Sequence, residues 1–440
     1  MRLRSATLSF VLCFSSWLLV SGIATPVVTV GQTVAIQPGP PEPVAEIWSQ
    51  SVIHSAVFSP DGQSVLTGNG YGSAQLWNAA TGKKIGKALR HPKDEIPTIS
   101  LIYGFTLGGL TGVQLYSGMR DLGAAYHFGM MKRVSEYSDE PLPVPKDIQI
   151  AAFSPDGKLI VTGSADGSAR VWERADEEWK RIGAPINLMT SLYSVQFSSD
   201  STRLVIAAFR SDARIWDART GKPLGKPLQH RDVIHCAAFS ADGRRVVTAS
   251  WDGSARIWDA MTGEPITAPL VHPSGQIPEY AMINPDGSRI VTSTTSNVAF
   301  IWDVSTGKQI GAPLKNKHGN LEAFALSPDG TRIAMAGDDG TVQLWDAATG
   351  KQSGKPMSHT PKVYCVGFSP DGKRLATGSV DQSARVWNIA DSSPLSPPLP
   401  HRAGVNSVRF SQDGTRLLTT IHPSPDDFFA SIWDVSDYKP

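Results

Sequence analysis

The chain has 440 residues, of which 41% are hydrophobic and 18% are charged, the composition of a globular protein. Its 41 Lys and Arg residues balance 40 Asp and Glu residues, so charge gives no electrostatic case for a nucleic-acid partner or an anionic membrane. The 40 Gly and 32 Pro residues stand in phase with a repeat along the chain, which indicates many turns rather than disorder.

Residues 1–24 are predicted to be an export signal. Arg2 and Arg4 precede an uncharged run over 6–20, and residues 22–24 offer small side chains for cleavage. The run is shorter than the ~20 residues of a membrane span, although it would anchor the protein if it stayed uncleaved. We therefore expect a periplasmic or secreted protein with no membrane span in its mature chain. Cleavage would leave 39 basic and 40 acidic residues.

Residues 25–43 are Pro-rich and polar, which is typical of a linker. Residues 44–440 are predicted to be one domain of repeated units, most regular over 230–272. There, Asp242-Gly243 and Asp252-Gly253 separate apolar and β-branched runs, a pattern typical of tight turns. A third run carries Trp258, and the prolines of 265–270 suit a fourth strand at a sheet edge. Each unit therefore predicts a four-stranded antiparallel sheet that cannot bury both faces alone.

The unit recurs along the domain with a period near 43 residues. The aromatic or aliphatic residue that closes the first strand stands at Phe58, Phe153, Phe197, Phe239, Ile283, Leu326, Phe368 and Phe410. The tryptophan of the third strand stands at Trp77, Trp172, Trp216, Trp258, Trp302, Trp345, Trp387 and Trp433. A period of about 40–45 residues with four strands per unit is the signature of β-propeller blades. The predicted fold class is therefore all-β, with eight regular repeats in a single closed propeller.

Five of these tryptophans are followed by Asp, at 216–217, 258–259, 302–303, 345–346 and 433–434. On these residues the chain resembles the WD-repeat (WD40-type) β-propeller family, in an exported form of bacterial type. The resemblance covers roughly residues 44–436.

One interval departs from the period, because Phe58 and Phe153 are 95 residues apart. Within residues 91–150, Thr111–Tyr116 lines up with a third strand, and His91 stands where other units carry a leading histidine. We interpret this stretch as a degenerate ninth unit or an insertion. A membrane span over 96–118 is the alternative, although its Gly, Pro and hydroxyl residues suit one poorly.

The two ends of the domain complement each other. The last unit has three strands up to Trp433 and no fourth, while residues 44–48 stand in phase with a fourth strand. We expect this N-terminal strand to complete the last blade and close the ring, which removes both free edges.

The WD-repeat resemblance implies a hydrogen-bond relay within a blade: a leading His, a Ser or Thr on the second strand, the turn Asp and the Trp. This predicts two sets of structural residues: His230, Ser250, Asp252 and Trp258, and His359, Ser379, Asp381 and Trp387. The same residue types could form a nucleophilic triad. Because the set recurs with the repeat, a structural role is favoured and no catalytic residue is expected. The unit of Phe153 lacks the His, and Arg210 stands where an Asp belongs, so these blades should be less rigid.

No metal-binding or cofactor-binding motif occurs, and none is expected. The mature chain keeps Cys236 and Cys365, at equivalent positions three units apart, too distant for a disulfide. We interpret both as small buried residues.

Function is therefore expected on a surface. In WD-repeat proteins, the residue four before the Phe and the residue before the turn Asp surround the channel mouth on the top face. Carried over, these positions predict a partner-binding set: Tyr193, Phe209, His235, Trp251, Glu279, Glu322, Asp338 and Tyr364. Aromatic residues exposed at turns suit interface anchors, although they could instead pack over neighbouring blades. An acidic strip beside them would favour a ligand with flanking Lys or Arg.

The predicted function is a non-catalytic, monomeric scaffold that binds a protein or peptide on its top face. The alternative is a propeller-type hydrolase or lactonase with a metal at the central channel. For that activity, Glu279, Glu322 and His235 are the candidate ligands.

Overall fold

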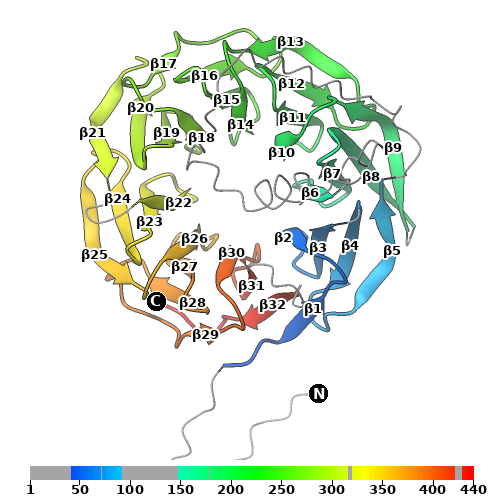
Figure 1. Ribbon diagram of the computed structural model, residues 1–440, viewed down its shortest axis with the longest axis vertical. Helices are drawn as coiled ribbons and strands as arrows, with labels where there is room; N and C mark the ends of the chain where they lie inside the picture. The colour runs from blue at the N-terminus through cyan, green and yellow to red at the C-terminus, as the bar shows by residue number, and fades with distance from the viewer. Residues whose placement is uncertain (1–40, 71, 92–146, 177, 316–319, 422–428) are drawn as a thin grey trace, which may run out of the picture. The chain divides into compact units, whose positions relative to one another are not determined.

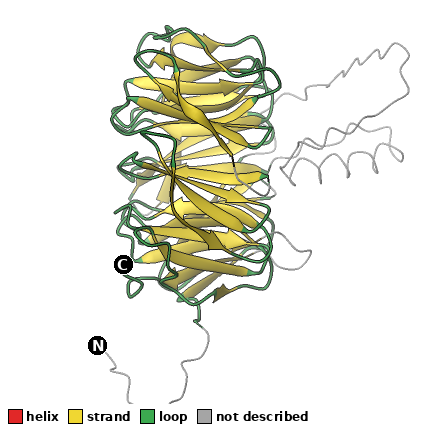
Figure 2. Ribbon diagram, turned by 90° about the vertical axis from the view of Figure 1, so that its left-hand side faces the viewer, coloured by secondary structure: helices red, strands yellow, loops and turns green. Residues whose placement is uncertain are grey.

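The computed structural model describes residues 41–70, 72–91, 147–176, 178–315, 320–421 and 429–440. Residues 41–440 form one compact unit, in which eight four-stranded antiparallel sheets are arranged as the blades of a ring (Figure 1). Seen from the side, the blades form a disc with two flat faces (Figure 2). The structure confirms the predicted all-β propeller of four-stranded blades.

The blades are numbered here in chain order, with the strands of each given from the inside of the ring outward. Blade 1 consists of β2 (Ile53–Phe58), β3 (Ser64–Asn69), β4 (Ser73–Asn78) and β5 (Lys84–Arg90); blade 2 of β6 (Ile148–Phe153), β7 (Leu159–Ser164), β8 (Ser168–Ala175) and β9 (Glu178–Asn187). Blade 3 consists of β10 (Leu192–Phe197), β11 (Arg203–Ala208), β12 (Asp212–Asp217) and β13 (Pro223–Gln229); blade 4 of β14 (Ile234–Phe239), β15 (Arg245–Ser250), β16 (Ser254–Asp259) and β17 (Leu270–Val271). Blade 5 consists of β18 (Pro278–Ile283), β19 (Arg289–Thr294), β20 (Val298–Asp303) and β21 (Gln309–Lys315); blade 6 of β22 (Leu321–Leu326), β23 (Arg332–Gly337), β24 (Thr341–Asp346) and β25 (Gln352–Ser358). Blade 7 consists of β26 (Val363–Phe368), β27 (Arg374–Ser379), β28 (Ser383–Asn388) and β29 (Leu399–Pro400); blade 8 of β30 (Val405–Phe410), β31 (Arg416–Ile421), β32 (Phe429–Asp434) and β1 (Ala45–Trp48).

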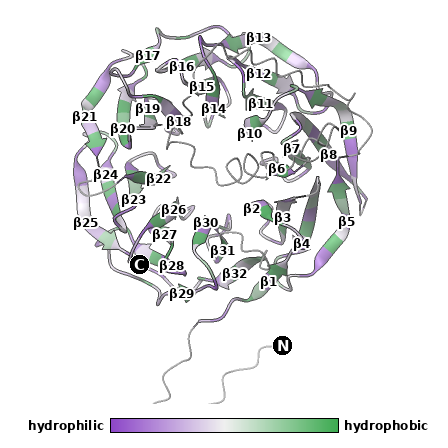
Figure 3. Cartoon of the chain, viewed as in Figure 1, coloured by the Kyte–Doolittle hydropathy of each residue, from purple (hydrophilic) through white to green (hydrophobic). Residues whose placement is uncertain are grey.

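The hydrophobic core lies between the blades. Side chains alternate along β11, so Leu204 and Ile206 join the cluster shared with blade 2, whereas Val205 and Ala207 join the cluster shared with blade 4. Residues 204–208 of β11 are therefore buried on both faces of the sheet. Outer strands such as β9 and β25 carry many hydrophilic residues, as Figure 3 shows. Each blade is stable only with a neighbour on either side.

The N-terminal strand closes the ring, as the sequence predicted. β1 pairs antiparallel with β32, with Ala45 opposite Ile432. Ile47 is fully buried in a cluster that joins blade 8 to blade 1. The Arg416 guanidinium of blade 8 also donates to the carbonyl oxygen of Gly62 in blade 1, over 3.1 Å. Strand pairing, apolar packing and a hydrogen bond therefore all cross the junction.

Blades 1 and 2 are direct neighbours although residues 92–146 separate them in the chain. β2 and β3 pack against β6, and His54 Nε2 lies 3.4 Å from Asp147 Oδ2. The predicted ninth unit over 91–150, and the stretch 96–118 weighed as a membrane span, lie almost wholly outside the described residues. Within the described ranges, the ring closes with eight blades, and no helix is long and apolar enough to cross a membrane.

The fourth strand of blade 4 is shorter than predicted. Instead of a strand over 265–270, the structure has the two-residue β17 and an isolated bridge between Trp258 and Pro265. Prolines alone do not explain this, because β13 of blade 3 has them at the equivalent positions 223 and 227. Between them blade 3 has Gly225 with a φ of 62°, whereas blade 4 has Thr267, and a residue with a side chain disfavours that left-handed conformation. Blade 7 repeats this arrangement, with β29 and a bridge between Trp387 and Pro394.

Candidate functional site

Four side chains of blade 4 form a continuous hydrogen-bond relay. His230 Nδ1 lies 2.9 Å from Asp252 Oδ2, and His230 Nε2 lies 2.7 Å from Thr248 Oγ1. Trp258 Nε1 donates to the same hydroxyl over 2.8 Å. Because the carboxylate can only accept, Nδ1 carries the proton and Nε2 accepts from Thr248. The threonine therefore donates to the histidine and accepts from the tryptophan, which joins the loop after β13 to β15 and β16.

The bridging hydroxyl belongs to Thr248, not to Ser250 as the sequence had suggested. Ser250 lies two residues further along β15, and its hydroxyl donates to the Asp232 carbonyl over 3.0 Å. It therefore shapes the turn instead of joining the relay. In blade 7, Thr377 likewise takes the position expected for Ser379.

The histidine of blade 2 precedes residues 92–146 in the chain, whereas the strands of that blade follow them. His91 follows β5, yet its Nε2 lies 2.9 Å from Thr162 Oγ1, and its Nδ1 lies 3.0 Å from Ser168 Oγ. Trp172 Nε1 completes the set by donating to Thr162 over 2.9 Å. The expectation that the unit of Phe153 lacks a histidine was therefore wrong. The residue is present but separated from its blade in the sequence.

Histidine, threonine and tryptophan are joined in this way in five blades, through His91, His230, His272, His359 and His401. Blade 1 keeps only the bond from Trp77 to Thr67. Blades 3 and 6 carry Ile206 and Met335 at the threonine position. There, the indole nitrogens of Trp216 and Trp345 are buried and have no hydrogen-bond partner among the described residues.

Burial and hydrogen bonds set the protonation states of the relay. Burial alone would raise the pKa of Asp252, but hydrogen bonds from His230, Ser254 and the Arg231 amide outweigh it and hold that pKa far below its usual value. His272 has a carbonyl oxygen, that of Gly253, in place of an aspartate at 3.2 Å. Burial lowers the pKa of His272 to about 4, so this ring is neutral at physiological pH.

The predicted aromatic residues lie together on the top face, the side of the disc that carries the turns between second and third strands. Ring contacts run from Trp251 to Phe209, Tyr193 and His235, with centroid separations of 6.0, 6.0 and 4.7 Å. The contacts then continue to Tyr280 and Phe324, which the sequence analysis missed, giving an aromatic row of Trp251, Phe209, Tyr193, His235, Tyr280 and Phe324.

Part of this aromatic row is open to solvent. Phe209 and Tyr280 are each 47% exposed, whereas the other four rings are half-buried. Phe209 does contact Trp251 of the next blade, so the packing interpretation holds in part. Met189, 68% exposed, lies on the loop whose Ser191 carbonyl accepts the Phe209 amide, and it extends the apolar surface.

The acidic residues predicted beside the aromatic row are largely engaged within the protein. The Glu322 side chain is only 6% exposed and lies 3.0 Å from Lys362 Nζ, which in turn lies over the Tyr364 ring. Asp338 accepts from the backbone and side-chain nitrogens of Asn320 at 2.6 and 2.8 Å. Of the predicted acidic strip, Glu322 is therefore paired with a cation and Asp338 is held by a neutral amide.

The candidate metal set does not assemble. His235 Nδ1 lies 3.1 Å from the backbone oxygen of Glu279, not from its carboxylate, while Glu322 pairs with Lys362. Over the described ranges, no group of three or more His, Cys, Asp or Glu side chains could hold a metal ion.

Cys236 and Cys365, the two cysteines among the described residues, are free thiols. Burial raises the pKa of the Cys365 thiol to about 12, and that of Cys236 also rises on burial. Thiols in this state are poor nucleophiles at neutral pH.

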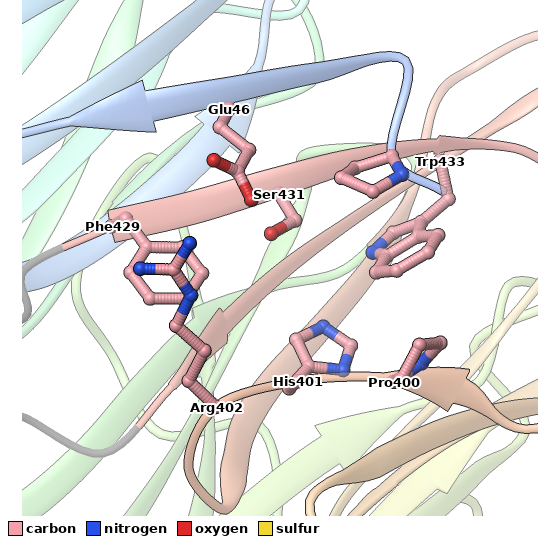
Figure 4. A pocket seen from close by; sticks show the side chains of 8 residues that line it. Glu46, Pro400, His401, Arg402, Phe429, Ser431 and Trp433 are labelled. Carbon is pink, nitrogen blue, oxygen red and sulfur yellow. The ribbon is translucent and has the colours of Figure 1, made fainter. Parts of the chain in front are cut away.

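A cavity of about 220 Å³ lies where the ring closes, between β1, β32 and the start of blade 8 (Figure 4). Glu46 and Ser431 line one side of it, and Arg402 lies over the Phe429 ring at 5.6 Å. His401 and Trp433, also in its wall, already hydrogen-bond to Thr419. The cavity therefore offers no set of side chains arranged for acid–base chemistry.

Known proteins support the same architecture. The WD domain, G-beta repeat family matches residues 145–173, 221–259, 311–346, 350–388 and 395–434. A curated relative, Protein HIR1 of Yarrowia lipolytica, is 25% identical over 187 residues, which cover 38% of this chain and 15% of that protein. The chain thus matches a small part of that protein's length.

The crystal structure of the computationally designed Ika8 protein superposes with a TM-score of 0.64 at 17% identity. The superposition covers 89% of this chain and 99% of the designed chain, and it supports the fold alone. The chain therefore carries WD40 repeats at five places and folds as an eight-bladed β-propeller.

Proposed function

We propose that this propeller is a non-catalytic scaffold that binds a protein or peptide on its top face. The observation that carries the proposal is the aromatic row, because two of its rings, Phe209 and Tyr280, remain 47% exposed while their neighbours hold them in place. Rigid aromatic side chains that are half open to solvent lose little conformational entropy on binding and suit interface anchors. The WD40 matches support a scaffold of this kind.

The test compares exposed apolar residues on the two faces. Phe209→Ala and Tyr280→Ala should each reduce capture of a partner from the native envelope or secreted fraction at least about tenfold, the loss typical of an interface anchor. Met261→Ala is the matched control, because Met261 is 72% exposed but lies in the turn after β16, on the opposite face. All three variants should melt within about 2 °C of the parent, since exposed side chains contribute little to stability.

Equal capture by the parent, Phe209→Ala and Tyr280→Ala would refute the proposed binding face. A large fall in melting temperature for Phe209→Ala would instead assign that ring to packing between blades 3 and 4.

We also propose that the scaffold works after export, on the basis of the pattern in residues 1–24. N-terminal sequencing of protein recovered from the envelope fraction would test it, and we expect a first residue near Thr25. An intact Met1 in a cytoplasmic fraction would refute it.

A further inference from the structure

The loops around Phe209 and Trp251 expose arginine side chains to solvent, whereas two of the three neighbouring carboxylates are largely buried. Three arginines stand there: Arg210 with a side chain 53% exposed, Arg214 with one 39% exposed, and Arg231, which is exposed. Asp212, Asp232 and Asp252 are the neighbouring carboxylates; the Asp212 and Asp252 side chains are 16% and 6% exposed, and Asp232 is exposed.

The first two arginines share one carboxylate. Arg210 Nε lies 3.0 Å from Asp212 Oδ1, and Arg214 Nε lies 3.5 Å from Asp212 Oδ2. The Asp212 side chain is only 16% exposed, so it lies beneath the two guanidinium groups. Both guanidinium groups are more exposed than the carboxylate that they share, so their positive charge faces solvent beside Phe209.

Arg231 adds a second available cation. Its backbone amide donates to Asp252 Oδ2 over 3.1 Å, but none of the described residues pairs with its guanidinium group. The Asp252 carboxylate is already engaged by His230, and the Asp232 carboxylate accepts the Val233 amide over 2.7 Å. The Arg231 guanidinium is therefore free to meet a ligand.

Backbone hydrogen bonds hold these loops against one another. The Ile234 amide donates to the Arg210 carbonyl and the His230 amide to the Ser211 carbonyl, at 2.9 and 2.8 Å. The Trp251 amide donates to the Val233 carbonyl at 2.9 Å. The loop of Arg231 therefore runs between the turn that carries Phe209 and the turn that carries Trp251. Apolar rings and exposed guanidinium groups form one fixed surface.

From this geometry we propose that the partner presents an acidic segment with an apolar side chain. The apolar side chain packs against Phe209 and Trp251, and flanking Asp or Glu residues meet Arg210 and Arg231. Guanidinium groups bind carboxylates through two parallel hydrogen bonds, which gives direction as well as attraction. The inference rests on the proposed top-face function and reverses the expectation of a basic ligand. Of the acidic residues behind that expectation, Glu322 pairs with Lys362 and Asp338 accepts from Asn320.

Labelled peptides would test the proposal. Three peptide pools share the same Leu and Phe positions but differ in flanking residues, which are Asp and Glu, Lys and Arg, or Ser and Gly. We expect the acidic pool to bind at least about tenfold more tightly than the basic pool at low salt, with the difference shrinking near 0.5 M salt. A single-stranded oligonucleotide of equal charge is included, and it should not compete.

Charge-reversal variants would show whether Arg210 and Arg231 bind the acidic peptides. Arg231→Glu combined with Arg210→Glu should abolish the preference for acidic peptides, and Arg231→Lys should retain most of it. Arg244→Glu is the matched control, because Arg244 is exposed in the first turn of the same blade 4, on the opposite face. Its affinity for the acidic pool should stay within about twofold of the parent.

The outcomes separate this inference from the proposed function. If peptides bind and Phe209→Ala weakens them, but without preference for the acidic pool, the inference fails and the binding face stands. If no pool binds, or if the oligonucleotide binds instead, both fail.

Discussion

Blades 3 and 4 are neighbours with the same strand order and similar apolar cores, yet their polar interiors differ. Blade 4 has the complete relay, whereas blade 3 has Ile206 in place of the threonine and leaves the Trp216 indole nitrogen buried without a partner among the described residues. Both blades are built from four paired strands. Strand pairing and apolar packing therefore determine the blade, and the relay reinforces it.

The loss of the relay in blade 3 also changes its surface. In blade 4, the turn between the second and third strands holds Asp252, which faces inward to His230. In blade 3, the equivalent residue is Arg210, whose side chain is 53% exposed. A turn released from the relay can present its side chains to solvent, and blade 3 presents Phe209 and Arg210 there.

If strand pairing determines the blade, removing a paired strand should lower stability more than removing any relay residue. Deleting residues 44–50 removes β1 with its buried Ile47 and reopens the ring. We expect a loss of roughly 4 kcal/mol or more in the free energy of unfolding, more than for any relay residue. Deleting residues 25–40 is the control and should have little effect in chemical denaturation. Equal effects of the two deletions would show that β1 contributes nothing to closure.

Exchanging the central residue between the two blades tests the relay directly. Thr248→Val should cost about 2–4 kcal/mol, because it leaves the His230 and Trp258 nitrogens unpaired inside blade 4. The reciprocal Ile206→Thr should change stability by less than about 1 kcal/mol, since the new bond to Trp216 offsets lost apolar packing. Similar losses from both variants in urea unfolding would mean that the hydroxyl is not what stabilises the complete blade.

The dependence of stability on pH distinguishes the relays from one another. Among the described residues, His272 of blade 5 has no acidic partner, and its pKa is about 4. The unfolded chain binds a proton near pH 6.5 and the folded chain does not, so stability is complete above 6.5 and falls as pH drops toward 4. The loss attributable to His272 should reach about 2–3 kcal/mol. His272→Gln should flatten this part of the profile in urea unfolding at several pH values, and an unchanged slope would contradict the assignment.

The smallest expected effect concerns the turn aspartate. Asp252→Ala should cost about 1–3 kcal/mol, and Asp381→Ala should behave alike because Asp381 lies 2.9 Å from His359. Asp217→Ala should cost less, because that carboxylate only accepts from Thr220 near the surface. Thermal melts of the three variants would check this order. Loss of binding by Asp252→Ala at unchanged stability would instead give that residue a functional role.

The repeat was readable from the sequence because tight turns and alternating apolar residues are local features. Asp-Gly turns and the spacing of tryptophans therefore predicted the strands, the blades and the closure by residues 44–48. The role of Thr248 could also have been predicted, because a threonine precedes the tryptophan by ten residues in five of the units. Ser250 fits the family pattern equally well as a residue type, and only the positions of the two side chains distinguish Thr248 from Ser250.

Other features could not be read locally. His91 reaches Thr162 across 71 residues, and no spacing rule indicates that a histidine belongs to the blade beyond an interruption. Tyr280 and Phe324 join the aromatic row because of the angle between adjacent blades, which the sequence does not encode in one place. Glu322 was expected at the surface, but its burial depends on Lys362 in the next blade.

The pairing of β1 with β32 has a consequence for how the chain folds. Other strand pairings join neighbours in sequence, whereas Ala45 meets Ile432 near the opposite end of the domain. The entropic cost of loop closure is therefore concentrated in one late step, and that step must wait until the ribosome has released the last strand. Until then, β1 and β32 each present an unpaired edge that could recruit another chain. Moving residues 44–48 to the C-terminus by circular permutation would make this pairing local, and the same ring would fold without the wait.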